Sequence, residues 1–200
     1  MNLASALSAL DQKEIEEIES ELLNSPAFKE TSKVITDDKS SLLISSVCSG
    51  LLYMAWLDRD LTKLEVKYLI RELKEFGEID KEKRKELIIL HSHLIKNETS
   101  FKEYIPLHFA YLKSILTSEQ RLQLYQDFII ISRSDLDISR KETDLIKSLG
   151  TYLKISKATQ DDLLVNAKFV VIQRLSEAAE DEPMVVLETP YSIPTIKLDL

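Results

Sequence analysis

The chain has 200 residues, of which 44% are hydrophobic, and a formal net charge of −8. This length allows one large domain or two small ones with a buried core, and the negative charge argues against a nucleic-acid partner, whose phosphates require clustered positive charge. The chain has only three Gly and five Pro, which favours helices over a strand-rich fold with many tight turns. Because the single Cys48 cannot form an internal disulfide, we expect a cytoplasmic protein.

The first half of the chain predicts a series of helices. Apolar residues recur at helical spacing up to about Asn24, and Ser25-Pro26 predicts the end of that stretch. Residues 26–39 are mixed and polar, and Asp37-Asp38 is a helix start signal. Residues 40–57 carry no charge but contain several serines, so they predict a helix buried on all sides and no direct membrane insertion.

Helices over about 66–76 and 80–95 follow, and residues 97–102 predict a connector. Pro106 suits the first turn of a further helix. The run Thr117-Ser118-Glu119-Gln120 is a capping signature for the helix after it.

The last quarter of the chain changes in composition. Helices are predicted to about residue 153 and over about 157–179. In the tail, Pro190 and Pro194 forbid a helix, and the Val, Ile and Thr content favours an extended chain. We expect this tail to pack on its own bundle or to reach a neighbouring subunit of a homo-oligomer.

Together these elements predict an all-α bundle of about seven to eight helices. We divide the chain into an N-terminal helical extension (1–37), a helical domain (38–180) and an extended C-terminal tail (181–200).

A short acidic motif occurs twice in the chain. One copy runs from Asp58 to Glu65 and the other from Asp135 to Glu142, so that matched residues lie 77 positions apart. Both copies read D-x-D-[LI]-[TS]-[KR]-x-E, and each opens a new amphipathic run. The repetition predicts a duplicated helical unit with an internal pseudo-twofold relation.

Two interpretations of this acidic turn remain open. In the first, Thr62 and Ser139 are N-caps and the glutamates three residues later complete two capping boxes. In the second, the carboxylates bind Ca²⁺ or another divalent cation, which takes about six to eight oxygen ligands. The start of each copy matches an EF-hand loop, but the Gly at position 6 and the Glu at position 12 are missing. The candidate metal ligands are Asp58, Asp60, Glu65, Asp135, Asp137 and Glu142.

Because of these two acidic motifs, the sequence resembles the tellurite-resistance TerB-like family. The resemblance covers roughly residues 38–178. The segments 57–61 and 134–138 stand where the family reads Ala-Asp-Gly-x-hydrophobic, although Arg59 and Leu136 replace the Gly. Glu65 and Glu142 match the acidic residue downstream. The resemblance implies a pseudo-twofold helical bundle with an acidic, metal-binding surface. It also implies a scaffold in a stress-response or membrane-associated complex and no catalytic activity.

Nothing else in the sequence identifies an enzyme. The rings of His91 and His93 point about 200° apart on a helix and do not converge on a metal. We interpret His91 as a core-edge residue, His108 has no evident partner, and Cys48 suits a small core position. We therefore expect a noncatalytic accessory or scaffold protein with a protein partner. The alternative is an immunity- or inhibitor-type protein whose acidic surface or tail binds a basic partner.

Overall fold

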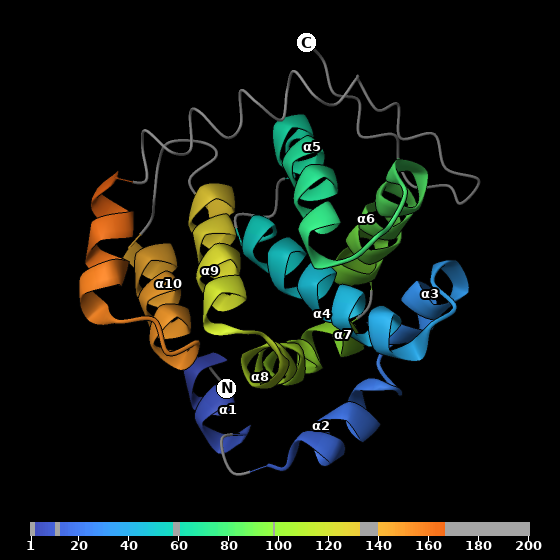
Figure 1. Ribbon diagram of the computed structural model, residues 1–200, viewed down its shortest axis with the longest axis horizontal. Helices are drawn as coiled ribbons and strands as arrows, with labels where there is room; N and C mark the ends of the chain where they lie inside the picture. The colour runs from blue at the N-terminus through green and yellow to red at the C-terminus, as the bar shows by residue number, and fades with distance from the viewer. Residues whose placement is uncertain (1–2, 11–12, 58–60, 98, 133–139, 167–200) are drawn as a thin grey trace.

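The computed structural model describes residues 3–10, 13–57, 61–97, 99–132 and 140–166. These residues form helices joined by short connections and contain no β-strand, which confirms the predicted all-α class. Residues 157–166 are also helical. The other helices, shown in Figure 1, are α1 (Leu3–Leu10), α2 (Ile15–Leu22), α3 (Pro26–Val34), α4 (Asp38–Ala55), α5 (Lys63–Glu72), the 3₁₀ helix η1 (Leu73–Phe76), α6 (Lys81–Asn97), α7 (Thr99–Glu103), α8 (Ile105–Ile115), α9 (Ser118–Ser132) and α10 (Arg140–Tyr152).

Helix α4 is the centre of the bundle. It begins where Asp37 caps it, with the side chain accepting a hydrogen bond from the Ser40 amide at 2.7 Å. It packs against α3, α6, α8 and α9. From Ser41 to Ala55 its residues are buried except for Leu43 and Tyr53, which are half-buried. The prediction of a helix buried on all sides is confirmed.

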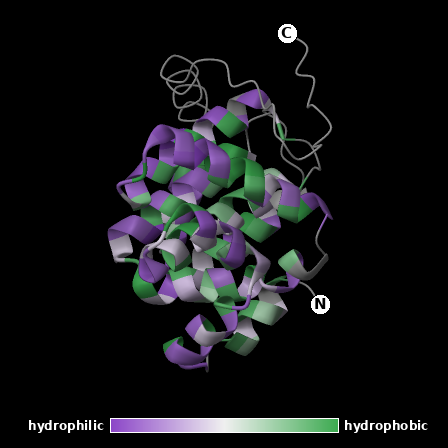
Figure 2. Cartoon of the chain, turned by 90° about the vertical axis from the view of Figure 1, so that its right-hand side faces the viewer, coloured by the Kyte–Doolittle hydropathy of each residue, from purple (hydrophilic) through white to green (hydrophobic). Residues whose placement is uncertain are grey.

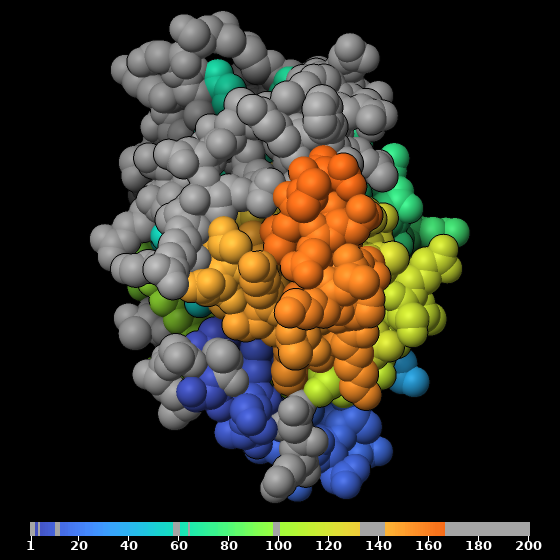
Figure 3. All heavy atoms as spheres, turned by 90° about the vertical axis from the view of Figure 1, so that its left-hand side faces the viewer, coloured from blue at the N-terminus to red at the C-terminus, as the bar shows by residue number. Residues whose placement is uncertain are grey.

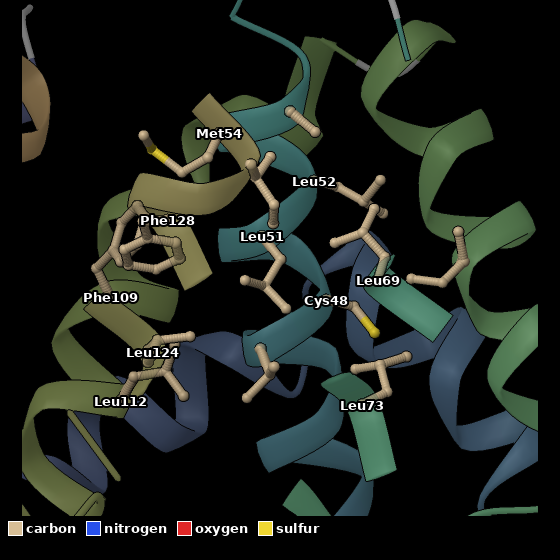
Figure 4. Packing of buried hydrophobic residues seen from close by; sticks show 14 of the residues in the cluster. Cys48, Leu51, Leu52, Met54, Leu69, Leu73, Phe109, Leu112, Leu124 and Phe128 are labelled. Atoms are coloured by element: carbon tan, nitrogen blue, oxygen red, sulfur yellow. The ribbon is translucent and has the colours of Figure 1, made fainter. Parts of the chain in front are cut away.

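The main hydrophobic core surrounds α4, as Figure 4 shows. Its side chains meet those of α5, α8 and α9, and the rings of Phe109 and Phe128 pack edge to face with centroids 5.5 Å apart. In Figure 4, Leu69 lies above Leu73, whereas Phe128 lies above Leu124, so α5 runs in the opposite direction to α9. The core therefore joins the helix that follows the first acidic turn to the helix that precedes the second.

The described residues contain more helices than the predicted seven to eight. The mixed, polar composition of residues 26–39 gave no bounds for a helix, and the structure forms α3 there, where Ser25 caps it by accepting a hydrogen bond from the Phe28 amide at 3.1 Å. Pro26 then occupies the first turn, where its missing N–H costs nothing. The predicted connector at 97–102 likewise contains most of the short helix α7 (Thr99–Glu103).

Helix boundaries in the two halves repeat at the offset of the acidic motif. The ends of α4 and α9, at Ala55 and Ser132, lie 77 residues apart, and so do the starts of α5 and α10, at Lys63 and Arg140. The pseudo-twofold relation in space stays a prediction. Residues 157–166 form an outer layer on one side of the molecule in Figure 3. The tail at 181–200 lies outside the described residues.

The outer surface is polar in the part of the chain that the structure describes. The charged run Lys81–Glu86 at the start of α6 is exposed or half-exposed, and Figure 2 shows hydrophilic residues along the outside of this side of the bundle. No helix among the described residues has both the length and the apolar character needed to cross a membrane.

Candidate functional site

The first acidic turn leads directly into α5 through a capping box. The Glu65 amide donates to Thr62 Oγ1 at 3.2 Å, and the Thr62 amide donates back to Glu65 Oε2 at 2.6 Å. Thr62 Oγ1 also donates to Glu65 Oε2 at 2.8 Å. Glu65 is only 2% exposed. The capping interpretation of Thr62 and Glu65 is therefore confirmed for the first copy.

The remaining predicted metal ligands lie outside the part of the chain whose side chains are described. These ligands are Asp58, Asp60, Asp135, Asp137 and the side chain of Glu142. Ser139, the predicted second N-cap, also lies outside it. Among the described residues, no group of three or more His, Cys, Asp or Glu side chains is arranged to hold a metal ion. The metal-binding prediction for the acidic turns stays a prediction.

A buried polar pair connects the helices next to the two turns. Tyr68 of α5 donates a hydrogen bond from its hydroxyl to Asp127 Oδ1 of α9 at 2.7 Å, and both residues are fully buried. Gln123 Nε2, one turn earlier on α9, donates to the same oxygen at 3.0 Å. A hydrogen-bonded carboxyl in the core orients its helices, because leaving it without donors would be costly.

The polar face of α5 continues beyond Tyr68. The Arg71 guanidinium lies 5.4 Å from the centroid of the Tyr68 ring, and its Nε donates to Glu72 Oε1 at 2.9 Å. Both charged side chains are about 5% exposed. At the end of α5, Arg84 of α6 donates to the carbonyl oxygen of Ile70 at 2.7 Å, which satisfies a helix-terminal acceptor.

This arrangement places the start of α5 and the end of α9 on the same side of the bundle. Tyr68 lies five residues after the start of α5, and Asp127 lies five residues before the end of α9. At 1.5 Å per residue, each helix end is about 7.5 Å along its axis from the bonded pair. Because α5 and α9 run in opposite directions, the start of α5 and the end of α9 lie at the same, upper end in Figure 1.

The single cysteine and two of the three histidines are buried in surroundings that do not activate them. Cys48 is fully buried, and burial raises the pKa of its thiol far above the usual value, which disfavours the reactive thiolate. Burial also lowers the pKa values of His91 and His108 to about 3, so both imidazoles are neutral near pH 7. These groups belong to a packed core and lie away from solvent.

The histidines differ from their predicted surroundings. His91 is fully buried and bonds through Nε2 to the Thr31 hydroxyl at 2.8 Å, so the core-edge placement was wrong. His108, for which the sequence offered no partner, bonds through Nδ1 to the Ser46 hydroxyl at 2.9 Å. Each partner lies at least 60 residues away in the chain, and local spacing carries no signal for such a pair.

The buried pair Tyr68 and Asp127 was not predicted from the sequence. One signal was available, since Asp127 immediately precedes the apolar run Phe128–Ile131 on α9. A carboxyl within an apolar helix face predicts a buried polar partner. It does not identify Tyr68 as that partner, because Tyr68 lies 59 residues away.

The comparisons with known proteins give one match. The family model described as "Tellurite resistance protein TerB" matches residues 45–163, more than half of the 200 residues. Neither the curated proteins nor the solved structures give a match. The matched range runs from α4 into the helical residues 157–166 and includes both acidic turns.

Proposed function

We propose that this chain, which belongs to the TerB family of tellurite resistance proteins, is a noncatalytic accessory protein. In this proposal its two acidic turns bind a divalent cation. In this proposal the protein acts as a scaffold in a stress-response or membrane-associated protein complex.

The observation that supports the cation proposal is a buried hydrogen bond between the helices that flank the two turns in the sequence. The bond between Tyr68 and Asp127 holds together α5, which begins after the first turn, and α9, which ends before the second. Six carboxylates in two copies of one motif are suitable oxygen donors for a hard cation such as Ca²⁺. Glu65 already serves the capping box, so the Asp residues are the more available ligands.

Calcium titration of the full chain tests this proposal. We expect Ca²⁺ to raise the melting temperature of the wild type, because a ligand that binds only the folded state stabilises it. Asp58→Asn and Asp135→Asn should each reduce this rise. Asp80→Asn is the matched control, since Asp80 caps the start of α6 by accepting from the Lys83 amide at 3.0 Å but belongs to neither turn.

The stoichiometry by calorimetry distinguishes one shared ion from two separate ions. If the turns share an ion, either Asp variant should abolish binding. If each turn holds its own ion, each variant should remove half of the sites. A wild type whose melting temperature and heat signal do not respond to Ca²⁺ or other divalent cations contradicts the cation proposal.

The alternative is an immunity- or inhibitor-type function, which the net charge of −8 favours. A pull-down with a chain ending at Glu182 tests it. Loss of a basic partner on removal of the tail, with the acidic turns intact, would favour this alternative over the scaffold.

A further inference from the structure

Helix α5 is buried on all sides, although it lies at the edge of the described bundle. Over residues 65–73 every residue is buried except Lys67, which is half-buried. The described elements that pack against α5 are mainly α4, α6 and η1, and Tyr68 bonds to α9. In Figure 1 the helix lies at the upper edge of the described elements. A helix at an edge normally exposes one face, so the outer face of α5 has a further neighbour.

A stripe of positive charge runs along this outer face. Lys63, Lys67 and Arg71 follow one another at intervals of four residues, so they share one side of the helix. This side is turned by about 130° from the core side chains of Val66 and Leu69. Lys63 and Lys67 are half-buried, and Arg71 is only 5% exposed. We call these three basic residues the α5 basic stripe.

The charges around the stripe indicate what kind of segment covers it. Positive charge is buried at low cost only where negative groups replace the water. Glu72 supplies one such group, since it accepts from Arg71 Nε at 2.9 Å. Arg84 of α6 adds a further positive charge, because its Nη1 donates to the carbonyl oxygens of Ile70 and Arg71 at 2.7 and 3.3 Å. A segment that fits this face therefore carries several carboxylates.

We propose that residues 177–182 of the same chain dock on the α5 basic stripe. This segment reads Glu-Ala-Ala-Glu-Asp-Glu, with four carboxylates and no positive charge. Arg71 follows Lys63 by eight residues, so the stripe is about 12 Å long. The acidic segment spans about 7.5 Å as a helix and about 17 Å as an extended chain. Its carboxylates therefore match the length of the stripe as well as its charge.

The acidic segment is also within reach of α5. The described part of the chain ends at Asn166, at the same upper end of Figure 1 as the start of α5. The ten residues 167–176 that precede the segment span up to about 33 Å. The first acidic turn fits the stripe less well. Asp60 precedes Lys63 by three residues, which leaves Arg71 about 12 Å further along the helix.

Zero-length crosslinking of the wild-type full chain tests the proposal. A carbodiimide joins a lysine amine to a carboxylate that touches it, and mass spectrometry of the peptides identifies the pair. We expect Lys63 or Lys67 to be joined to a carboxylate of residues 177–182. Lys85 and Glu82 are the positive control, since Lys85 Nζ lies 2.7 Å from Glu82 Oε1.

Three results of this experiment overturn the proposal. The first is that the stripe is joined only to the acidic turns. The second is that the stripe gives no crosslink although the control pair reacts. The third is a crosslink between two molecules, detected in a mixture of ¹⁵N-labelled and unlabelled chains, because a second copy then covers the stripe.

An exchange of charges provides an independent test. Lys67→Glu should lower the folding equilibrium constant by about 1.5- to fivefold, the range for a partly exposed ion pair. Substitution of the crosslinked carboxylate by Lys in the same chain should recover most of this loss. A double variant whose loss is the product of the two single losses overturns the proposal. Lys29→Glu is the control, since Lys29 is exposed on α3 and the same second substitution should recover nothing.

Discussion

The buried polar residues of this protein are its most constrained positions. Tyr68, Asp127, His91 and His108 are all fully buried, and each is bonded to a residue on another helix. Burial without a partner would cost more than the bond contributes. These side chains therefore determine which helices lie next to one another, in addition to contributing to stability.

The two core histidines predict acid sensitivity. Their pKa values are about 3 in the folded protein and about 6.5 when unfolded. Because the folded values are lowered, the unfolded state binds more protons below pH 6.5, and stability decreases as the pH falls from 6.5 toward 3. At pH 5 each histidine should reduce the free energy of unfolding by about 2 kcal/mol.

Urea unfolding at pH 7.5 and pH 5 measures this effect. Separately, the ring-proton resonances of His91 and His108 should not titrate while the protein stays folded. Equal unfolding free energies at the two pH values would contradict the burial of neutral histidines.

Gly150 is a position where no side chain fits. A Cβ atom there would lie 2.7 Å from Gln160 Cδ and 2.8 Å from Tyr125 Cε2. We expect Gly150→Ala to cost about 1–3 kcal/mol in the free energy of unfolding, because Gln160 and the buried Tyr125 must move. Gly77→Ala is the matched control, since its Cβ would make only ordinary contact, with Ile44 Cδ1 at 3.6 Å. Chemical denaturation of both variants should separate them, and equal stability would contradict the close packing of α10.

At the scale of elements, α5 and α9 are the pair that matters for the proposed site. One begins after the first acidic turn and the other ends before the second. The bond between Tyr68 and Asp127 fixes how they lie together, and Arg84 attaches the end of α5 to α6. The start of α5 and the end of α9 are thus positioned by helix packing as well as by the Thr62–Glu65 capping box.

Removal of one hydroxyl tests the importance of this pair. We expect Tyr68→Phe to lower the free energy of unfolding by about 1–3 kcal/mol, because Asp127 loses a donor in the core. Tyr125→Phe is a matched control, since Tyr125 is equally buried but its hydroxyl has no protein partner. This control should be neutral or slightly stabilising. Thermal melts of the two variants provide the comparison. A similar loss of stability in both variants would mean that the hydrogen bond from Tyr68 to Asp127 does not stabilise the fold.

At the scale of the whole molecule, the N-terminal extension is packed into the bundle. Ala27 and Thr31 of α3 are fully buried, and α3 packs against α4 and α6. The Ser41 hydroxyl of α4 donates to the Ile35 carbonyl at 2.6 Å. The extension thus covers part of the helix that forms the centre of the core.

Deletion of residues 1–37 should therefore strongly destabilise the chain. The deletion exposes apolar surface of α4, α6 and α8 and removes the Thr31 partner of His91, and each effect opposes folding. Leu23→Ala is a control within the same extension, because Leu23 is 44% exposed and should change stability by less than about 0.5 kcal/mol. Circular dichroism melts measure both. A shortened chain that melts at the wild-type temperature would show that the extension is dispensable.

The sequence by itself determined the properties that depend on neighbouring residues. Apolar spacing predicted the all-α class and a buried α4, and residues three positions apart predicted the Thr62–Glu65 and Thr117–Gln120 caps. The short helix α7 was missed, and the bounds of α3 within the predicted helical extension were not identified, because the apolar patterns of both are brief and their stability comes from packing on the bundle.

Only the tertiary structure decided the polar contacts of the core. Tyr68 bonds to Asp127, His91 to Thr31 and His108 to Ser46 across 59 to 62 residues of chain. No local pattern identifies such partners, because any helix that packs at that place can supply the matching group. The physical reason is that periodicity and capping act within about one helical turn, whereas a buried polar group is satisfied by whichever neighbour the complete packing brings to it.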